Sequence, residues 1–220
     1  MKKNKMMRIA SVLLVAVILT TCAISGTFAK YVTSGSGSDT ARVAKFGVTV
    51  SGTAETFAKT YVAHDGSFTV ATNTVVSTEN VVAPGTSGSM AVFTITGTPE
   101  VAVRVAFTGT LELGDKWVDS ASAYYCPIEV TVGDTTFKGL DYDSADEFEA
   151  AVNAKIATFT NDYAAGTNLN GIGGDAPAIS WKWAFEGNDN VKDTYLGDQA
   201  AAGEAARISL DVTATVTQID

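Results

Sequence analysis

The chain has 220 residues, with 15 Lys and Arg against 24 Asp and Glu, a formal net charge of −9 at pH 7. This length suits one domain with a sizeable core, and the acidic balance argues against nucleic acid and anionic membrane surfaces as partners. The only histidine, His64, excludes a zinc protease site, which needs two histidines on one helical face.

The chain opens with the pattern of an export signal. Four basic residues and no acid precede an almost unbroken apolar run at residues 9–24. Thr27 and Ala29 then place small residues at the −3 and −1 positions of a signal peptidase site. We therefore expect residues 1–29 to be a signal peptide, cut between Ala29 and Lys30. The protein would then be secreted, in the extracellular matrix or at the cell surface, and would touch the membrane only through this segment before cleavage.

Two other interpretations of the leader remain open. A retained transmembrane anchor is one, although the apolar run is shorter than the roughly 20 residues that span a bilayer. A lipoprotein site at residues 19–22 is the other, although Thr21 is large for the position beside Cys22.

Cleavage would leave a strongly acidic chain with one thiol. The leader holds four of the 15 basic residues and no acid, so residues 30–220 keep 11 basic and 24 acidic residues, a charge of −13. Cys126 is then the only cysteine, which excludes an intrachain disulfide. Its apolar surroundings beside Pro127 favour a buried, inert thiol.

Residues 30–40 read as a flexible N-terminal segment, because the short stretch Lys30-Tyr31-Val32-Thr33 is followed by a Ser/Gly linker. From Ala41 onward we expect one β domain, residues 41–220. Ala44, Phe46, Val48 and Val50 alternate with polar residues or glycine, which predicts a half-buried first strand.

Further alternating runs predict more strands, at residues 89–96, 101–113, 124–132, 135–138, 179–185 and 208–217. In the polar region that follows the first strand, the residues expected to point inward as anchors are Phe57, Tyr61, Phe68 and Val70. Pro84-Gly85 predicts a type II turn, and Gly133-Asp134 predicts a hairpin.

One helix is predicted at about residues 144–160, where Ser144 and Glu147 form a capping box and apolar residues recur at helical spacing. Residues 189–203 are expected to be a long polar connection. Many short strands with one inserted helix indicate an all-β fold, a jelly-roll-like β-sandwich.

No pattern predicts an enzyme. His64 adjoins Asp65-Gly66, which looks like a hairpin tip, so it is expected to be a solvated turn residue rather than part of a Ser-His-Asp site. Other motifs fail in context: Gly171, Gly173 and Ala176 precede proline and a strand instead of a helix, and Asp141, Asp143 and Asp146 lack the glycine of a calcium loop. No cofactor is expected; the candidate calcium ligands are Asp189, Asp193 and Asp198.

Short blocks at both ends and in the middle of the chain, residues 23–31, 38–46 and 82–89, resemble the start and the proline-glycine turn of the TasA/camelysin family of secreted proteins from Gram-positive bacteria. Residues 181–186, with 193–194 and 196–197 before a terminal strand ending at 215–220, are similar to the C-terminal half of related clostridial proteins. The resemblance implies cleavage by a SipW-type signal peptidase, a jelly-roll domain, and a role as structural subunit of extracellular biofilm-matrix fibres.

The same resemblance implies how the fibres would assemble. In such fibres the freed N-terminal segment of one subunit adds as a strand to the next. We therefore expect a head-to-tail homopolymer in which the donor residues are Lys30, Tyr31, Val32 and Thr33. The metalloprotease label of some relatives is not carried over, because the histidines are lacking.

The alternative is a monomeric secreted or surface-associated module that binds carbohydrate or a host protein. Trp117, beside Gly114-Asp115-Lys116, is the candidate for stacking on a sugar. Trp181 and Trp183 share the expected inner face with Ile179 and Phe185, which favours core packing for them.

Overall fold

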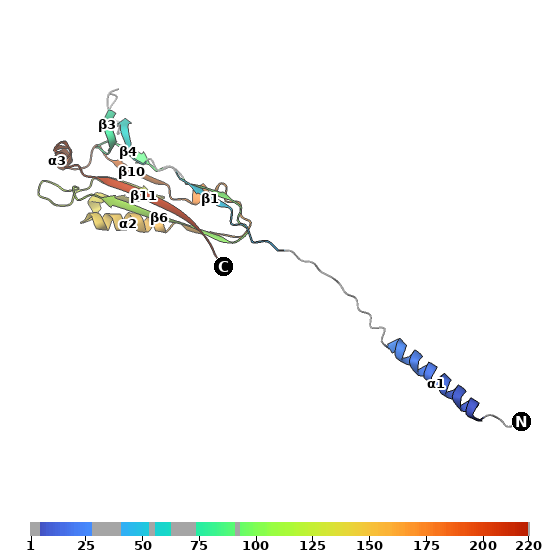
Figure 1. The fold of residues 1–220 in the computed structure, drawn as a ribbon. Coiled ribbons are helices and arrows are strands. Elements are labelled where there is room, and N and C mark those ends of the chain that lie inside the picture. The colour runs from blue at the N-terminus through green and yellow to red at the C-terminus, as the bar shows by residue number, and fades with distance from the viewer. Residues whose placement is uncertain (1–4, 28–40, 53–55, 63–73, 91–92, 220) are drawn as a thin grey trace. The chain divides into compact units, whose positions relative to one another are not determined.

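The computed structural model describes residues 5–27, 41–52, 56–62, 74–90 and 93–219 (Figure 1). The chain divides into two compact units, Met1–Val43 and Ala44–Asp220, and each is described by itself.

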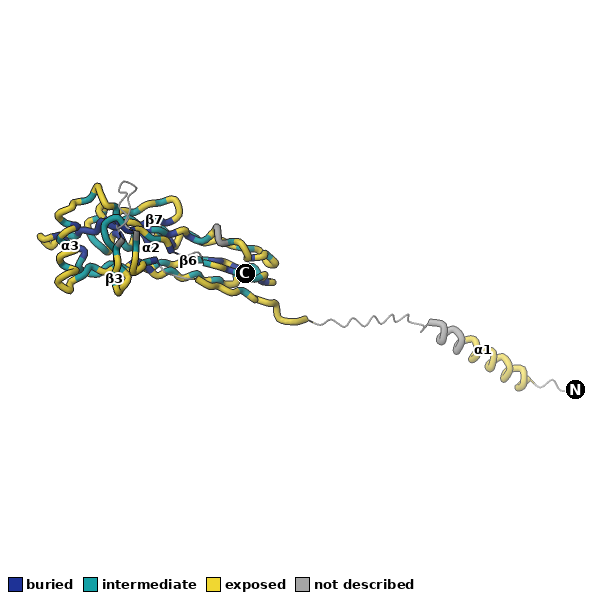
Figure 2. Tube along the Cα trace, turned by 90° about the horizontal axis from the view of Figure 1, so that it is seen from above, coloured by how far each residue is buried: buried dark blue, intermediate teal, exposed yellow. Residues whose placement is uncertain are grey.

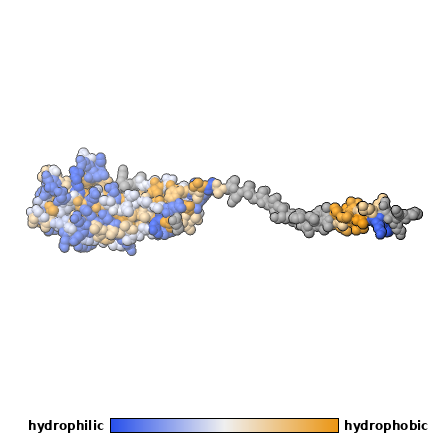
Figure 3. Space-filling model, turned by 60° about the horizontal axis from the view of Figure 1, so that its bottom comes forward, coloured by the Kyte–Doolittle hydropathy of each residue, from blue (hydrophilic) through white to orange (hydrophobic). Residues whose placement is uncertain are grey.

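The first unit contains helix α1, Lys5–Thr27. Its sequence has no proline, and no glycine before Gly26, so nothing interrupts the helix where apolar residues are continuous. Large apolar side chains such as Met6 and Leu13 are exposed, and Figure 3 shows the apolar surface of this helix with hydrophilic atoms near its N-terminal end. None of the helices in the described ranges has the length and hydropathy of a membrane span.

The second unit is built mostly of antiparallel strands. The described strands form a four-stranded sheet in the order β4–β10–β7–β8, a three-stranded sheet in the order β11–β6–β9, and the pairs β1–β5 and β2–β3. Their bounds are β1 Val48–Ser51, β2 Ala58–Val62, β3 Thr74–Val81, β4 Ser87–Ser89, β5 Thr94–Gly97, β6 Val103–Leu113, β7 Ile128–Val132, β8 Thr135–Lys138, β9 Thr160–Tyr163, β10 Ile179–Trp183 and β11 Ile208–Gln218.

The longest pairing joins β6 to β11. These strands run antiparallel in unbroken register from Ile208↔Leu113 to Gln218↔Val103 (Figure 1). Both follow the period-2 alternation expected from the sequence, and the inward residues of β6 are almost fully buried, with Val103 at 0% and Phe107 at 2% exposure. The predictions of these two strands are confirmed.

Helix α2, Ala145–Ala157, packs on β6. Ser144 caps it by accepting a hydrogen bond from the Glu147 N–H at 3.3 Å, as the capping box predicts. Glu147 does not complete the box, because its Oε2 accepts from Asp143 N–H instead. The buried face of the helix is formed by the expected apolar residues, Phe148, Val152 and Ile156.

The buried residues gather in the interior of this unit (Figure 2).

Two turns that link the strands are as predicted. Thr86 N–H donates to the Ala83 carbonyl at 3.0 Å, and Gly85 has φ +82°, the positive corner of a type II turn. Gly133, with φ +62°, lies in the turn between β7 and β8.

Several sequence predictions are wrong in extent. The first strand begins at Val48, and Phe46 is 41% exposed, because Gly47 adopts φ +47° and breaks the extended run. The strand expected at 89–96 is two short strands, β4 and β5, in different sheets. The strand expected at 124–132 starts at Ile128.

The predicted polar connection at 189–203 is also wrong, because a second helix of this unit, α3, spans Asn190–Ala201. Asp189 caps it by accepting hydrogen bonds from the N–H groups of Val191 and Lys192. Only Asp193 and Leu196 of this helix are buried, so it lacks the apolar stripe that would have marked it in the sequence.

Gly109 allows α2 to lie close to β6. A Cβ at this position would lie 2.3 Å from Ile156 Cδ1 and 3.2 Å from Ile156 Cβ. Gly109→Ala should therefore lower the free energy of unfolding of residues 30–220 by about 1–3 kcal/mol, measured by denaturant titration.

Gly197 is the matched control. It lies in α3 with nothing within 4 Å of the added Cβ. Gly197→Ala should raise the free energy of unfolding by up to about 1 kcal/mol, because alanine favours helix. Equal effects of the two substitutions would contradict the close packing at Gly109.

Candidate functional site: the groove beside strand β11

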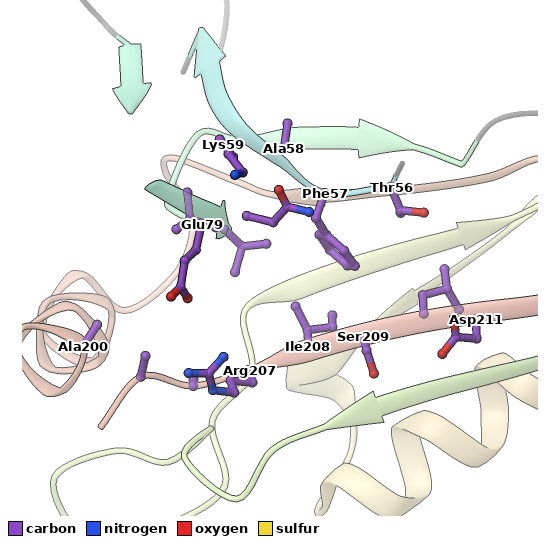
Figure 4. Close-up of a pocket in the computed structure, with 16 residues that line it drawn as sticks. Thr56, Phe57, Ala58, Lys59, Glu79, Ala200, Arg207, Ile208, Ser209 and Asp211 are labelled. Atoms are coloured by element: carbon purple, nitrogen blue, oxygen red, sulfur yellow. The ribbon is translucent and has the colours of Figure 1, made fainter. Parts of the chain in front are cut away.

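A groove of about 700 Å³ lies between the β2–β3 hairpin and the start of β11 (Figure 4). One wall comes from residues 56–59 and 79–82, and the other from residues 205–211, with Ala200 of α3 at one end. Figure 4 shows Phe57 on the hairpin side and Ile208 on the β11 side. The groove is thus bordered by apolar side chains and by strand backbone.

Trp181 of β10 holds the hairpin wall in place. Its Nε1 donates to the Thr56 carbonyl at 2.8 Å, and its ring contacts Phe57 and Tyr61 at centroid distances of 5.2 and 5.8 Å. Gly88 lets the indole lie close, since a Cβ there would lie 2.7 Å from the Trp181 Nε1. The wall is therefore fixed to the four-stranded sheet, although among the described strands β2 and β3 pair only with each other.

A bulge in the β2–β3 pairing shapes the hairpin wall of the groove. The β2–β3 register shifts between Ala58↔Val81 and Thr60↔Val76, so Lys59 alone stands opposite residues 77–80. Glu79 and Asn80 belong to this bulged stretch and line the groove. The bulge therefore brings polar groups to a wall that would otherwise be apolar.

The β11 wall is anchored by Arg207. Its carbonyl accepts hydrogen bonds from Gly114 N–H at 2.9 Å and from Trp117 Nε1 at 2.7 Å.

Lys59 and Arg207 supply positive charge to the groove, while Glu79 and Asp211 supply negative charge. Thr56, which also lines it, has a buried Oγ1 without a hydrogen-bond partner in the described part of the chain. The lining can therefore receive a chain with both apolar and polar groups.

The residues expected to carry assembly lie outside the described residues. These are the cut between Ala29 and Lys30 and the donor stretch through Tyr31, Val32 and Thr33. His64, Phe68 and Val70 also lie outside them.

The expectation that Trp117 offers a surface for sugar stacking is wrong. Trp117 is 2% exposed, and its indole N–H is used by the Arg207 carbonyl. Trp181 and Trp183 are buried as expected, at 3% and 5% exposure, whereas Phe185 is 46% exposed because β10 ends at Trp183. The three tryptophans therefore present no open stacking face.

The three candidate calcium ligands do not form a metal-binding group in the described structure. Asp189 caps α3, and Asp198 is exposed on it. Asp193 is buried, where its carboxylate accepts hydrogen bonds from the Tyr125 hydroxyl at 2.7 Å and from Trp183 Nε1 at 3.4 Å. Burial raises the pKa of Asp193, although both hydrogen bonds act in the opposite direction.

The other motifs have structural roles. Asp146 lies in the first turn of α2, as expected of an acid at a helix N-terminus. Gly171 precedes a short 3-10 helix, η2 at Ile172–Asp175, rather than an α-helix. Cys126 is fully buried, and burial raises the pKa of its thiol to about 12, so the expected inert thiol is consistent with its surroundings.

Sequence reasoning missed the groove because its walls come from segments more than 120 residues apart. The alternation of β11 was visible, and so were Phe57 and Tyr61 as anchors, but no local pattern signals that the hairpin packs against the start of β11. Comparison of the chain with family models, with characterised proteins and with solved structures gave no match.

The raised pKa of Asp193 has a measurable consequence. A carboxyl whose pKa is higher in the folded than in the unfolded state stabilises the fold most below its unfolded pKa, and loses that contribution as pH rises through the folded pKa. The free energy of unfolding of the wild type minus that of Asp193→Asn should therefore fall as pH rises from about 3 to about 7. Denaturant titrations at each pH measure it.

Tyr125→Phe is the control. It removes the 2.7 Å hydrogen bond that favours the ionised carboxylate. In the Tyr125→Phe background the difference in free energy of unfolding between Asp193 and Asp193→Asn should therefore fall at a higher pH than in the wild type. A difference that does not vary with pH would contradict the buried, perturbed carboxyl.

Proposed function

We propose that this chain is a secreted structural subunit of extracellular biofilm-matrix fibres, similar to the TasA/camelysin proteins. A SipW-type signal peptidase would release residues 30–220, and the freed segment 30–40 would add as a strand to a neighbouring copy. The proposal takes the β-rich unit to be a jelly-roll sandwich, requires no cofactor and includes no enzyme activity.

The observation that carries the proposal is the division of the chain. Residues up to Val43 are not part of the compact unit Ala44–Asp220, which has a core of its own. Val43 is 91% exposed and Phe46 41% exposed, so apolar side chains directly after the donor segment lack cover. Such residues at the exit of a linker suit contact with another copy better than solvent.

Open sheet edges supply the other half of the mechanism. Each of the four described sheets and pairs ends in strands with one neighbour. Edge strands expose unpaired N–H and C=O groups that an added strand can satisfy. Because one copy gives and the next receives, the contact is head-to-tail and forms filaments instead of closed dimers.

Deletion of residues 30–38 tests the proposal. The chain 30–220 should form fibres visible by negative-stain electron microscopy, whereas the chain 39–220 should remain a folded monomer, because its core lies wholly within residues 44–220. Thermal unfolding checks that both chains are folded.

A matched variant, with Gly35 and Gly37 replaced by Ser, keeps the length and polarity of the segment and should still form fibres. Undiminished fibres from the chain 39–220 would refute the donor role. A chain 30–220 that stays monomeric at every concentration would refute the fibre and favour the monomeric binding module.

A further inference from the structure

The backbone of β11 has an unused hydrogen-bonding edge. On β6, the N–H groups of Leu111 and Leu113 donate to the side chains of Asn153 and Glu149 in α2. The backbone N–H and C=O groups of the odd-numbered residues of β6 therefore point away from β11. The even-numbered ones therefore bond to β11, at its odd-numbered residues, as the register requires. The hydrogen bond from Gly114 N–H to the Arg207 carbonyl continues this alternation.

The backbone N–H and C=O groups of the even-numbered residues of β11 consequently point to the side of the strand away from β6. No strand pairs with that side among the described residues, and no hydrogen bond there uses the backbone of these positions. They are Ile208, Leu210, Val212, Ala214, Val216 and Gln218.

The side of β6 that faces away from β11 is already occupied. Strand β9 pairs with β6 from Val103 to Ala106, and the Phe107 N–H donates to the Phe159 carbonyl. Beyond that point Asn153 and Glu149 cover the edge with side chains. Covering an edge with a helix prevents strand addition, so on this side the open edge of the sheet is that of β9, which spans four residues.

The core is also incomplete along β11. The inward residues of β6 are buried, with Val105 at 3% and Leu111 at 1% exposure. On β11 only Leu210 is buried, whereas its other inward residues are partly exposed, namely Ile208, Val212, Ala214 and Val216. A further strand beside β11 would cover these side chains.

The other edges offer less. Strands β4 and β8, at the two sides of the four-stranded sheet, span three and four residues. Among the described edge strands of the other sheets and pairs the longest is β3, with eight residues, against eleven in β11. The groove beside residues 208–211 adds room for side chains of an added strand at one end of β11. It also holds the unpartnered Thr56 Oγ1.

We propose that the free edge of β11 is the acceptor, and that residues 30–40 of a second copy pair with it. This inference rests on the proposed function and names the site at which it operates. The segment between the expected cut and Ala41 has eleven residues, the same length as β11, so in extended form the two match in reach. The apolar residue Val43, 91% exposed, would then follow the added strand.

Ala214→Pro in the chain 30–220 tests the edge. Proline removes the N–H of residue 214, which faces the free edge, and leaves the hydrogen bonds to β6 in place. The variant should stay folded, by circular dichroism and thermal unfolding, and lose fibres by electron microscopy. Ala214→Gly, which keeps the N–H, should retain them.

Cysteine pairs give a second test that does not depend on proline. One copy carries Val32→Cys or Thr33→Cys, which face opposite sides of an added strand. The other carries one cysteine on the outer face of β11, at Ser209, Thr213 or Thr217. Matched controls place it at the paired positions of β6, namely Glu112, Thr108 and Arg104.

A neighbouring strand brings Cβ atoms within about 5 Å, whereas the next strand lies about 10 Å away, beyond disulfide reach. Oxidation of mixed copies should therefore link the donor to at least one β11 position and to none on β6, as read by mass spectrometry. Cys126 is fully buried and should not compete.

The outcomes separate the two proposals. Fibres from a folded Ala214→Pro chain, or fibres in which no β11 cysteine links to the donor, would overturn the assignment of this edge and leave strand donation standing. Absence of fibres from the unaltered chain 30–220 would overturn the proposed function and this inference with it.

Discussion

The pairing of β6 with β11 is the constraint on which the rest of the β-rich unit depends. Eleven consecutive positions are matched without a bulge, so every inward side chain of one strand has a fixed neighbour on the other. Helix α2 lies against β6 at Gly109 and closes its remaining edge with Asn153 and Glu149. These contacts leave β11 as one of the two outer strands of this sheet, and the longer of them.

The same arrangement ties assembly to folding. On one side of this sheet, β9 and α2 occupy the edge of β6, and the outer strand β9 spans four residues. On the other side, β11 offers an edge of eleven residues, and its apolar inner face is partly uncovered. The hairpin β2–β3, held by Trp181, borders the groove at one end of this edge. Strand β11 thus completes the core with β6 and, in the proposed fibre, also receives the N-terminal segment of the neighbouring copy.

Sequence patterns predicted the elements whose residues alternate or repeat over a long stretch. Strands β6 and β11 and helix α2 have apolar periods that few other conformations satisfy, and Pro84-Gly85 specified its turn through the positive φ that glycine allows. The cut site and the donor segment stay predictions, because residues 28–40 lie outside the described structure. The export role of the leader and the fibre also stay predictions.

The errors come from contacts that are distant in sequence. Trp117 stands among Gly, Asp and Lys and looked like a surface residue, yet its indole is buried against the Arg207 carbonyl, 90 positions away. Helix α3 lacks an apolar stripe and is recognisable mainly by the Asp189 cap. The first strand was drawn too long because alternation alone does not reveal that Gly47 takes a positive φ.

Hydrogen exchange resolved to single amides of β11 tests the central claim most directly. In the folded monomer of residues 39–220, the odd-numbered amides from Ser209 to Thr217 should be protected by β6, and the even-numbered amides from Ile208 to Val216 should exchange fast. In fibres of residues 30–220 the account predicts protection of both sets. Even-numbered amides that exchange as fast in the fibre as in the monomer would contradict it.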